Sequence, residues 1–246
     1  MQVVRENKLK CLSFLLALAL LIAVVAVAAS GGSSTAKRQL VTPREPDAVA
    51  RTYALLAGIP QYGPVLGYRR APVALQFFGD LQCIDSRRVM LGALPFLIRR
   101  YVRTGKLQIQ FRSKETDTKE AGGWFEFREQ QVAAMAAGKQ DKLWNFISVF
   151  YRNQGPEFSR YVDDPFLERV AKQAGLDIDD WKKAREPPEK WVPRIEYDEA
   201  IANAARLRST PSFVIGPTGG VARPLRHFAL EEPAVFEEAI REVLST

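Results

Sequence analysis

The chain has 246 residues, of which 47% are hydrophobic and 26% charged, and its formal net charge at pH 7 is +7. This composition is typical of a globular protein with a sizeable core. It excludes intrinsic disorder, a collagen-like repeat and a disulfide-stapled miniprotein as descriptions of the whole chain. There are two cysteines, Cys11 and Cys83, and one histidine, His227. A structural zinc site needs about four such ligands, so we expect no metal site and no cofactor, and chemistry that uses a single thiol or none.

The amino-terminal segment predicts export. Residues 11–29 contain no charged side chain, and three basic residues lie among the first ten. A run of about 20 apolar residues can cross a bilayer as a helix, and the basic residues predict a cytoplasmic amino terminus. We therefore expect residues 1–29 to be a signal anchor that holds the protein in the cell membrane. A cleaved signal peptide, leaving a secreted or periplasmic protein, is the alternative, because residues 26–28 fit a small-residue cleavage site.

The rest of the chain then lies in an oxidising compartment outside the cytoplasm. We expect a flexible linker at residues 30–44 and a folded domain at residues 45–246. The basic doublets, such as Arg69-Arg70 and Arg87-Arg88, are separated and have no aromatic platform beside them. We therefore expect no nucleic-acid partner, and ascribe the positive charge to solubility and contact with an anionic membrane surface.

The first half of the folded part alternates helices and strands. In chain order, the pattern predicts a helix at residues 45–57, a Gly/Pro-rich connector at 59–72, a buried strand at 73–78, a helix at 83–103 and a strand at 107–112. The buried face of the first helix would hold Val49, Tyr53 and Leu56, and Pro95 would kink the second. The strand–helix–strand order predicts a parallel pair joined by a right-handed crossover.

The second half is predicted to be a helical block followed by two strands and a closing helix. The expected helices span residues 124–137, 142–151, 165–174, 177–181 and 195–208, the strands 211–216 and 225–228, and the last helix 233–244. Asp164 and Asp177 are candidate amino-terminal caps. His227 falls in the returning strand, where we expect an edge or surface residue rather than a catalytic base.

Three stretches of the chain resemble the DsbA-like exported proteins of the thioredoxin fold. Phe77 to Ser86 matches their strand and active-site motif, Gly58 to Val73 their lead-in, and Ser209 to Gly216 their cis-proline strand. The resemblance covers residues 45–246. It implies an α/β, thioredoxin-like fold (βαβ, then ββα) with an inserted helical domain, here at about residues 120–193.

The active-site motif departs from the family's pattern. The family has Cys-x-x-Cys, whereas this chain reads Cys83-Ile84-Asp85-Ser86. In the family the first cysteine attacks a substrate disulfide, and the second resolves the mixed disulfide. Exchange requires a thiolate attacker and a sulfur leaving group, so Ser86 can neither release Cys83 nor store a disulfide. We expect Cys83 to be an accessible thiol that forms mixed disulfides and needs an outside thiol to release them.

Opposing effects act on the pKa of Cys83. The amino terminus of a helix favours the thiolate, a hydrogen bond from the Ser86 hydroxyl would add to this, and Arg87 and Arg88 bring positive charge. Asp85 acts in the opposite direction, because a nearby negative charge disfavours the thiolate. The sign of the net shift is open at this point.

The resemblance implies further site residues. Thr210-Pro211 would be a cis peptide against the active-site cysteine, and the backbone of Thr210 would pair with a bound substrate segment. A proline that only begins a strand is the alternative. Ile84 and Asp85, which follow the cysteine, are the other expected substrate contacts. Asp80 occupies an acidic position that the family also carries, where it would either orient the turn or handle a proton.

Three functions remain open. We favour an extracytoplasmic protein with a single active-site thiol, Cys83, that exchanges disulfides with exported polypeptides and depends on an external thiol or redox partner. The second is a non-catalytic binding or chaperone-like module of the same fold. The third is a kappa-type glutathione transferase or a related isomerase, against which the export segment argues.

Overall fold

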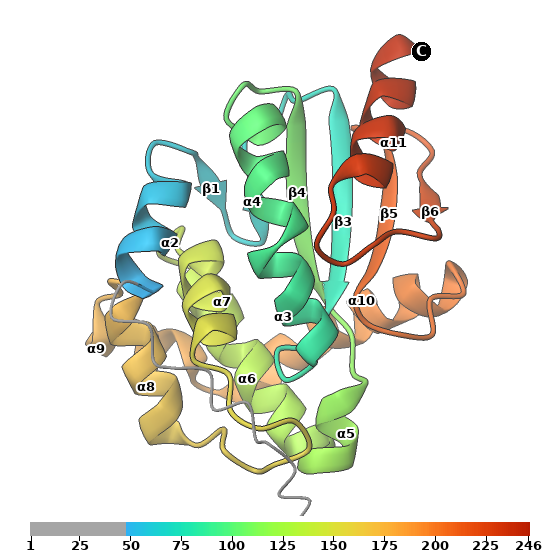
Figure 1. Ribbon diagram of the computed structural model, residues 1–246. Coiled ribbons are helices and arrows are strands. Elements are labelled where there is room, and N and C mark those ends of the chain that lie inside the picture. The colour runs from blue at the N-terminus through green and yellow to red at the C-terminus, as the bar shows by residue number, and fades with distance from the viewer. Residues whose placement is uncertain (1–47) are drawn as a thin grey trace, which may run out of the picture. The chain divides into compact units, whose positions relative to one another are not determined.

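The structure is a computed structural model and describes residues 48–246, apart from the side chains of residues 48, 120 and 121 (Figure 1). The expected signal segment at residues 1–29 and the linker at residues 30–44 lie outside this range. Within residues 48–246 there is no helix of sufficient length and apolar character to cross a membrane.

One mixed sheet carries the fold, with the strand order β1-β2-β4-β3-β5-β6. The strands are β1 (Gln61–Tyr62), β2 (Val65–Leu66), β3 (Val73–Gly79), β4 (Leu107–Ser113), β5 (Ser212–Pro217) and β6 (Arg223–Leu225). Strand β3 pairs in parallel with β4 and antiparallel with β5. The predicted parallel pair is therefore confirmed, and it lies at the centre of the sheet.

Helices cover the sheet and fill the long connection between β4 and β5 (Figure 1). They are α2 (Ala48–Leu56), α3 (Ile84–Leu91), α4 (Ala93–Leu97), the π-helical turn η1 (Ile98–Val102), α5 (Asp117–Ala121), α6 (Gly123–Gly138), α7 (Leu143–Arg152), α8 (Asp164–Gln173), α9 (Ile178–Arg185), the 3₁₀ turn η2 (Pro188–Trp191), α10 (Val192–Ala204) and α11 (Ala234–Ser245). Helices α5 to α10 all lie between β4 and β5 in the sequence, so the predicted helical block between these strands is confirmed.

Strand alternation divides the core between the two faces of the sheet. On one face Phe77 stacks on Phe213 with ring centroids 5.1 Å apart, and Phe213 meets Phe236 of α11 edge-on at 4.9 Å. On the other face Phe78 and Val214 pack with Ala202 of α10 in a smaller cluster. Burial on both faces holds the carboxyl end of β3, and therefore the turn that follows it, in a fixed position.

The predicted single helix at residues 83–103 is wrong. The chain forms α3, α4 and η1, and the break lies at Gly92, with φ −99° and ψ −86°, rather than a kink at Pro95. Proline has no N–H, and its ring would collide with the carbonyl four residues earlier, that of Leu91. The break directly after Leu91 removes that collision and leaves α3 as a separate short helix.

The connector predicted at residues 59–72 contains the hairpin β1–β2, which adds two strands at the edge of β4. Two-residue strands are too short to show an alternating pattern. Gly67 follows this hairpin with φ +104°, and a Cβ there would lie 2.8 Å from Val102 Cγ1. Glycine is therefore required where the connector passes against η1.

The structure also tests the predicted buried face of the first helix and two predicted helix caps. The prediction that Leu56 faces inward is confirmed, but Tyr53 is 40% exposed, and Thr52 and Leu55 are buried instead. Asp163, not Asp164, caps α8, because its carboxylate accepts from Phe166 N at 2.7 Å. The cap at Asp177 of α9 is confirmed.

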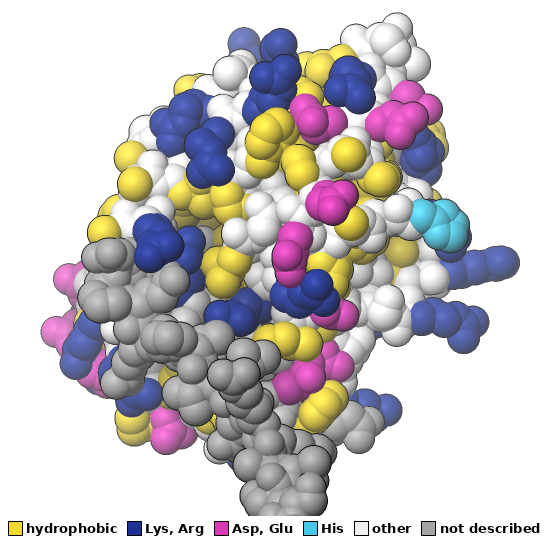
Figure 2. Space-filling model, viewed as in Figure 1, with side chains coloured by type: hydrophobic (Ala, Val, Ile, Leu, Met, Phe, Trp, Pro, Cys, Tyr) yellow, Lys and Arg dark blue, Asp and Glu magenta, His cyan; other side chains and the backbone are white. Residues whose placement is uncertain are grey.

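His227 follows β6 instead of lying within a strand, and its φ is +57°. It is exposed, as expected for a surface residue, and Figure 2 shows it in cyan at the edge of the molecule. On the face drawn in that figure, basic side chains are dispersed among acidic ones (Figure 2).

Candidate active site

Cys83 lies at the amino terminus of α3, one short turn after β3 ends. It is the N-cap residue of the helix, its N–H donates to Asp80 O at 3.2 Å, and its carbonyl accepts from Arg87 N at 3.1 Å. The residue is only 3% exposed. The expectation of an accessible thiol is therefore wrong for this state of the molecule, because neighbouring segments cover the helix terminus.

The segment before β5 is one of these neighbours. The peptide bond between Thr210 and Pro211 is cis, and the thiol of Cys83 donates to Thr210 O at 3.4 Å. The Thr210 hydroxyl lies 2.5 Å from that of Thr116. Residues 127 positions apart are thus brought into direct contact, as the resemblance implies.

The pKa of Cys83 is raised to about 12. Burial is the main cause, and a hydrogen bond to the carboxylate of Asp117, the first residue of α5, is the next. A hydrogen bond from the Thr210 side-chain hydroxyl and the backbone N–H of Ser86 favour the thiolate but are outweighed. The net shift of the Cys83 pKa, whose direction the sequence left open, is therefore a rise.

The side chains of Arg87 and Arg88 in α3 bond to groups other than the Cys83 sulfur. Arg87 Nε donates to Tyr151 O at 2.9 Å. Arg88 is paired with Asp85 at 3.2 Å and with Glu231 at 3.0 Å. Both guanidinium groups are therefore directed to partners other than the sulfur.

Ser86 is fully buried. Its hydroxyl lies near that of Tyr151 but makes no hydrogen bond of normal geometry within the described chain. The expected hydrogen bond from this hydroxyl to Cys83 is therefore absent among these residues, and Ser86 acts on the sulfur through its backbone N–H.

The loop between α7 and α8 covers the amino terminus of α3. Gln154 Nε2 donates to the carbonyls of Leu81, at 2.9 Å, and Cys83, at 3.1 Å. Glu157 Oε1 accepts from Ile84 N at 3.2 Å. Burial raises the pKa of Glu157, and this hydrogen bond opposes the rise only in part. The loop places a carboxylate where the helix end would otherwise favour a thiolate.

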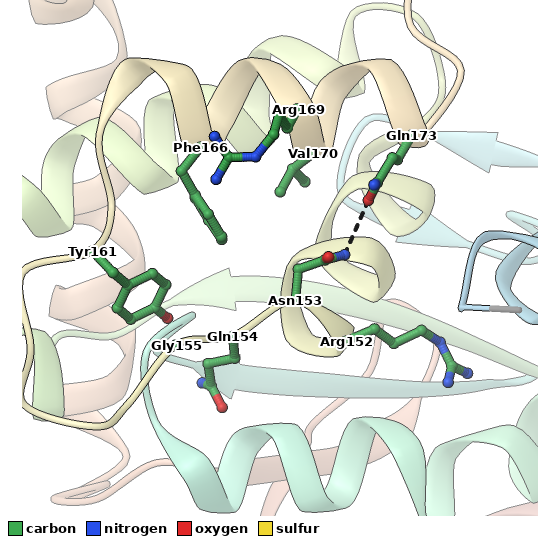
Figure 3. A pocket seen from close by; sticks show the side chains of 9 residues that line it. All are labelled: Arg152, Asn153, Gln154, Gly155, Tyr161, Phe166, Arg169, Val170 and Gln173. Carbon is green, nitrogen blue, oxygen red and sulfur yellow. Dashed lines mark hydrogen bonds between the residues drawn. The ribbon is translucent and has the colours of Figure 1, made fainter. Parts of the chain in front are cut away.

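This loop borders a cavity of about 240 Å³ on its side facing α8 (Figure 3). Asn153 Nδ2 donates to Gln173 Oε1 at 3.0 Å across one wall. Tyr161 and Phe166 meet edge-on with centroids 5.1 Å apart at another. Gly155 packs closely against the Tyr161 ring, and empty space adjoins the rest of this part of the covering loop.

Asp80 holds the turn before the cysteine. Its buried carboxylate accepts five hydrogen bonds, from the backbone N–H groups of Gln82, Thr116 and Thr118, from the Thr118 hydroxyl and from the Gln130 amide. These contacts tie the turn after β3 to the start of α5, which carries Asp117. Of its two proposed roles, the geometry favours the orienting one.

The variant Asp80→Asn is expected to lower the free energy of unfolding by about 2–4 kcal/mol, because an amide would place donors against donors in a buried network. Urea denaturation followed by circular dichroism measures this. The matched control is Asp85→Asn, whose carboxylate is 47% exposed, and a much smaller change is expected there. Equal effects of the two substitutions would contradict the orienting role.

The structure thus brings Cys83 together with Thr210 and Pro211, and places Ile84, Asp85 and Ser86 in the first turn of α3. Sequence reasoning missed Asp117, Gln154 and Glu157. They lie in segments whose local pattern gives no indication of the site, and only tertiary packing brings them to the cysteine.

A family model described as thioredoxin matches residues 60–220. Among curated proteins, the chain is similar to a probable disulfide bond formation protein D of Bacillus anthracis, with 25% identity over 169 residues, 65% of this chain and 71% of that one. It is also similar to disulfide bond formation protein D of Bacillus subtilis, with 20% identity over 157 residues, 62% of this chain and 67% of that one.

Solved structures show the same fold. Oxidised BdbD from Bacillus subtilis superposes with a TM-score of 0.63 and 19% identity, over 78% of this chain and 98% of that one. Wolbachia pipientis α-DsbA1 superposes with a TM-score of 0.59 and 20% identity, over 74% of this chain and 90% of that one. With more than half of its length matched by the family model, the chain belongs to the thioredoxin family, and its fold is that of the DsbA-like members.

Proposed function

We propose that this protein carries out thiol–disulfide exchange on exported polypeptides through one thiol, that of Cys83. The observation that carries the proposal is the position of its sulfur, at the N-cap of α3 and 3.4 Å from the Thr210 carbonyl before a cis proline. The names of the curated relatives, which are disulfide bond formation proteins, support this chemistry.

In the proposed reaction Cys83 gives up its proton to solvent, and the sulfur attacks a substrate disulfide as a thiolate. The substrate S–S bond breaks, and a new S–S bond joins Cys83 to one half of the substrate. The other sulfur leaves as a thiolate and takes up a proton from solvent. Since Ser86 has no sulfur, an external thiol, such as glutathione or a protein thiol, must attack the mixed disulfide. This second step releases Cys83 as a thiol and leaves the external thiol disulfide-bonded to the substrate.

Attack requires the sulfur to be uncovered. The loop that carries Gln154 and Glu157 borders a cavity, so it has room to shift without disrupting the core. Once Cys83 is a thiolate, it no longer donates to the Thr210 carbonyl. That carbonyl is then free to pair with the backbone of a substrate segment, which Ile84, Asp85 and Pro211 would also contact.

We also propose that the protein works outside the cytoplasm, where disulfides persist. The support is the apolar segment at residues 11–29, which would serve as a membrane anchor or be removed as a signal peptide.

A specific observation favours a second candidate, a peptide-binding module without exchange chemistry. The thiol is buried, and its pKa is raised to about 12, so Cys83 is held as a thiol at neutral pH. A binding module needs the segment around Thr210 and Pro211 but no thiolate.

The test is exchange between glutathione and a fluorogenic peptide disulfide, with the full chain, Cys83→Ala and Cys11→Ala compared. We expect the full chain and Cys11→Ala to raise the rate by at least about tenfold over the uncatalysed reaction, and Cys83→Ala to leave it at background. If Cys83→Ala matches the unaltered chain, exchange is excluded. If the unaltered chain and Cys83→Ala then bind a cysteine-free peptide equally well, the peptide-binding module is supported.

A further inference from the structure

A second cavity, of about 420 Å³, lies at the edge of the sheet beside β4. It is enclosed by the β1–β2 hairpin, β4, α6 and the start of α10, and it shares no lining residue with the Cys83 site. Its volume is within the range of small-molecule sites, about 300–1,000 Å³. The proposed exchange reaction makes no use of it.

Two basic side chains, those of Arg69 and Lys139, lie at the entrance of this cavity. Arg69 Cζ lies 4.4 Å from the ring centroid of Tyr62, and Lys139 Nζ lies 5.6 Å from that of Trp191. Both basic side chains belong to exposed residues that line the cavity, and across residues 48–246 no carboxylate pairs with either. The entrance is therefore electropositive and has aromatic faces beside each charge.

The floor offers hydrogen-bond donors. Gln131 accepts from the Ser113 hydroxyl at 3.0 Å through its oxygen, while its Nε2 is buried and has no acceptor within the described chain. Arg194 Nη2 is also buried. It lies 3.4 Å from Asp198 Oδ1 without a well-directed hydrogen bond.

Asp198 is shared between Arg194 and a second arginine, Arg112. Its Oδ1 takes a 2.6 Å hydrogen bond from Arg112, and its Oδ2 takes one from Ser113 N at 3.1 Å. Arg112 does not line the cavity and neutralises this carboxylate from the strand side. The positive charge of Arg194 is therefore only partly compensated, and it faces the cavity alongside unmet donors.

Apolar side chains form the walls between floor and entrance. Phe111 of β4 and Leu143 of α7 are buried, Met135 of α6 and Trp191 are half-buried, and all four line the cavity. The indole N–H of Trp191 is already bonded to Ala184 O at 3.0 Å, so its ring offers only an apolar face. Such walls favour a ligand that has a flat apolar ring system.

We propose that this cavity binds a small organic anion that carries one carboxylate and a flat apolar ring system. The carboxylate would lie near Arg194 and the cations at the entrance, and the ring system would lie between Phe111, Met135 and Trp191. A carboxylate supplies the acceptors that Gln131 and Arg194 lack, and charge-assisted hydrogen bonds of this kind are the stronger ones. A neutral ligand would leave the cations unmatched, and a cationic one would be repelled.

The test uses three probes that share one ring system: naphthoate, its neutral amide naphthamide, and naphthylmethylammonium. Saturation-transfer-difference NMR with the purified full chain measures binding of each. We expect naphthoate to bind at least about tenfold more tightly than naphthamide, and the ammonium probe not to bind. Equal binding of acid and amide, or no binding of naphthoate at about 1 mM, would overturn the proposal.

Variants locate the site. Lys139→Gln and Arg194→Gln are each expected to weaken naphthoate binding about three- to tenfold and to leave naphthamide binding unchanged. Because Arg194 also pairs with Asp198, the melting temperature of the Arg194→Gln variant is measured to detect a loss of stability. Lys139 is exposed, so Lys139→Gln tests the site without this complication. Lys190→Gln is the matched control, since Lys190 Nζ also faces the Trp191 ring, at 5.8 Å, but does not line the cavity. If Lys190→Gln weakens binding as much as Lys139→Gln, the site is not this cavity.

Discussion

Ser86→Cys is expected to shorten the lifetime of the mixed disulfide at Cys83 by about two orders of magnitude or more. A thiol three residues along the first turn of α3 would attack the mixed disulfide within the same molecule, and held reactants gain a high effective concentration. The substitution replaces a buried hydroxyl that makes no hydrogen bond of normal geometry within the described chain. We therefore expect little loss of stability.

Acid quenching followed by mass spectrometry measures the decay of the mixed disulfide without added thiol. Ser148→Cys is the matched control, because Ser148 is a buried serine of α7 whose hydroxyl also has no acceptor or donor in residues 48–246. We expect it to leave the lifetime unchanged. An unchanged lifetime in Ser86→Cys would show that position 86 cannot reach the sulfur, and that the missing second thiol is not what limits release.

The reactivity of Cys83 is expected to rise steeply with pH far above neutrality. With its pKa raised from the ordinary value of 9.0 to about 12, the thiolate fraction of Cys83 at pH 7 is about three orders of magnitude below that of an unperturbed thiol. Because the folded state holds this proton more strongly than the unfolded state, Cys83 contributes less stability as the pH rises from the ordinary pKa of 9.0 toward about 12.

Iodoacetamide labelling, with the Cys83 peptide quantified separately from the Cys11 peptide, measures this profile. Asp117→Asn removes the hydrogen bond and charge that raise the pKa, so we expect about tenfold faster labelling at neutral pH. Asp85→Asn is the control, because Asp85 is not among the groups that raise the Cys83 pKa. A midpoint near that of a free thiol in the unaltered chain would contradict the buried, protonated state.

The sequence was sufficient for those parts of the site that local motifs carry. The apolar run that forms β3, the cysteine after its turn and the proline before β5 each have a short-range pattern, and the structure places them as expected. The three-part helix after Cys83 shows the limit of such patterns. Pro95 correctly predicted that the helix would be disrupted. Its ring would collide with the carbonyl of Leu91, one turn earlier, so the helix breaks at Gly92 and not at the proline itself.

The environment of the sulfur could not be predicted in this way. Its burial and the direction of its pKa shift depend on α5 and on the loop that carries Gln154 and Glu157, which pack against α3 from distant parts of the chain. A helix amino terminus alone predicts a lowered thiol pKa. Tertiary burial and acidic neighbours reverse this here.

The central claim is that one thiol forms a covalent intermediate that this chain cannot resolve alone. The direct measurement is the intact mass of the full chain after incubation with a peptide disulfide, followed by a glutathione chase. We expect a mass increase of one half-peptide, mapped to Cys83, that persists without glutathione and disappears with it. No adduct at Cys83, or an adduct that is lost without any added thiol, would contradict this claim.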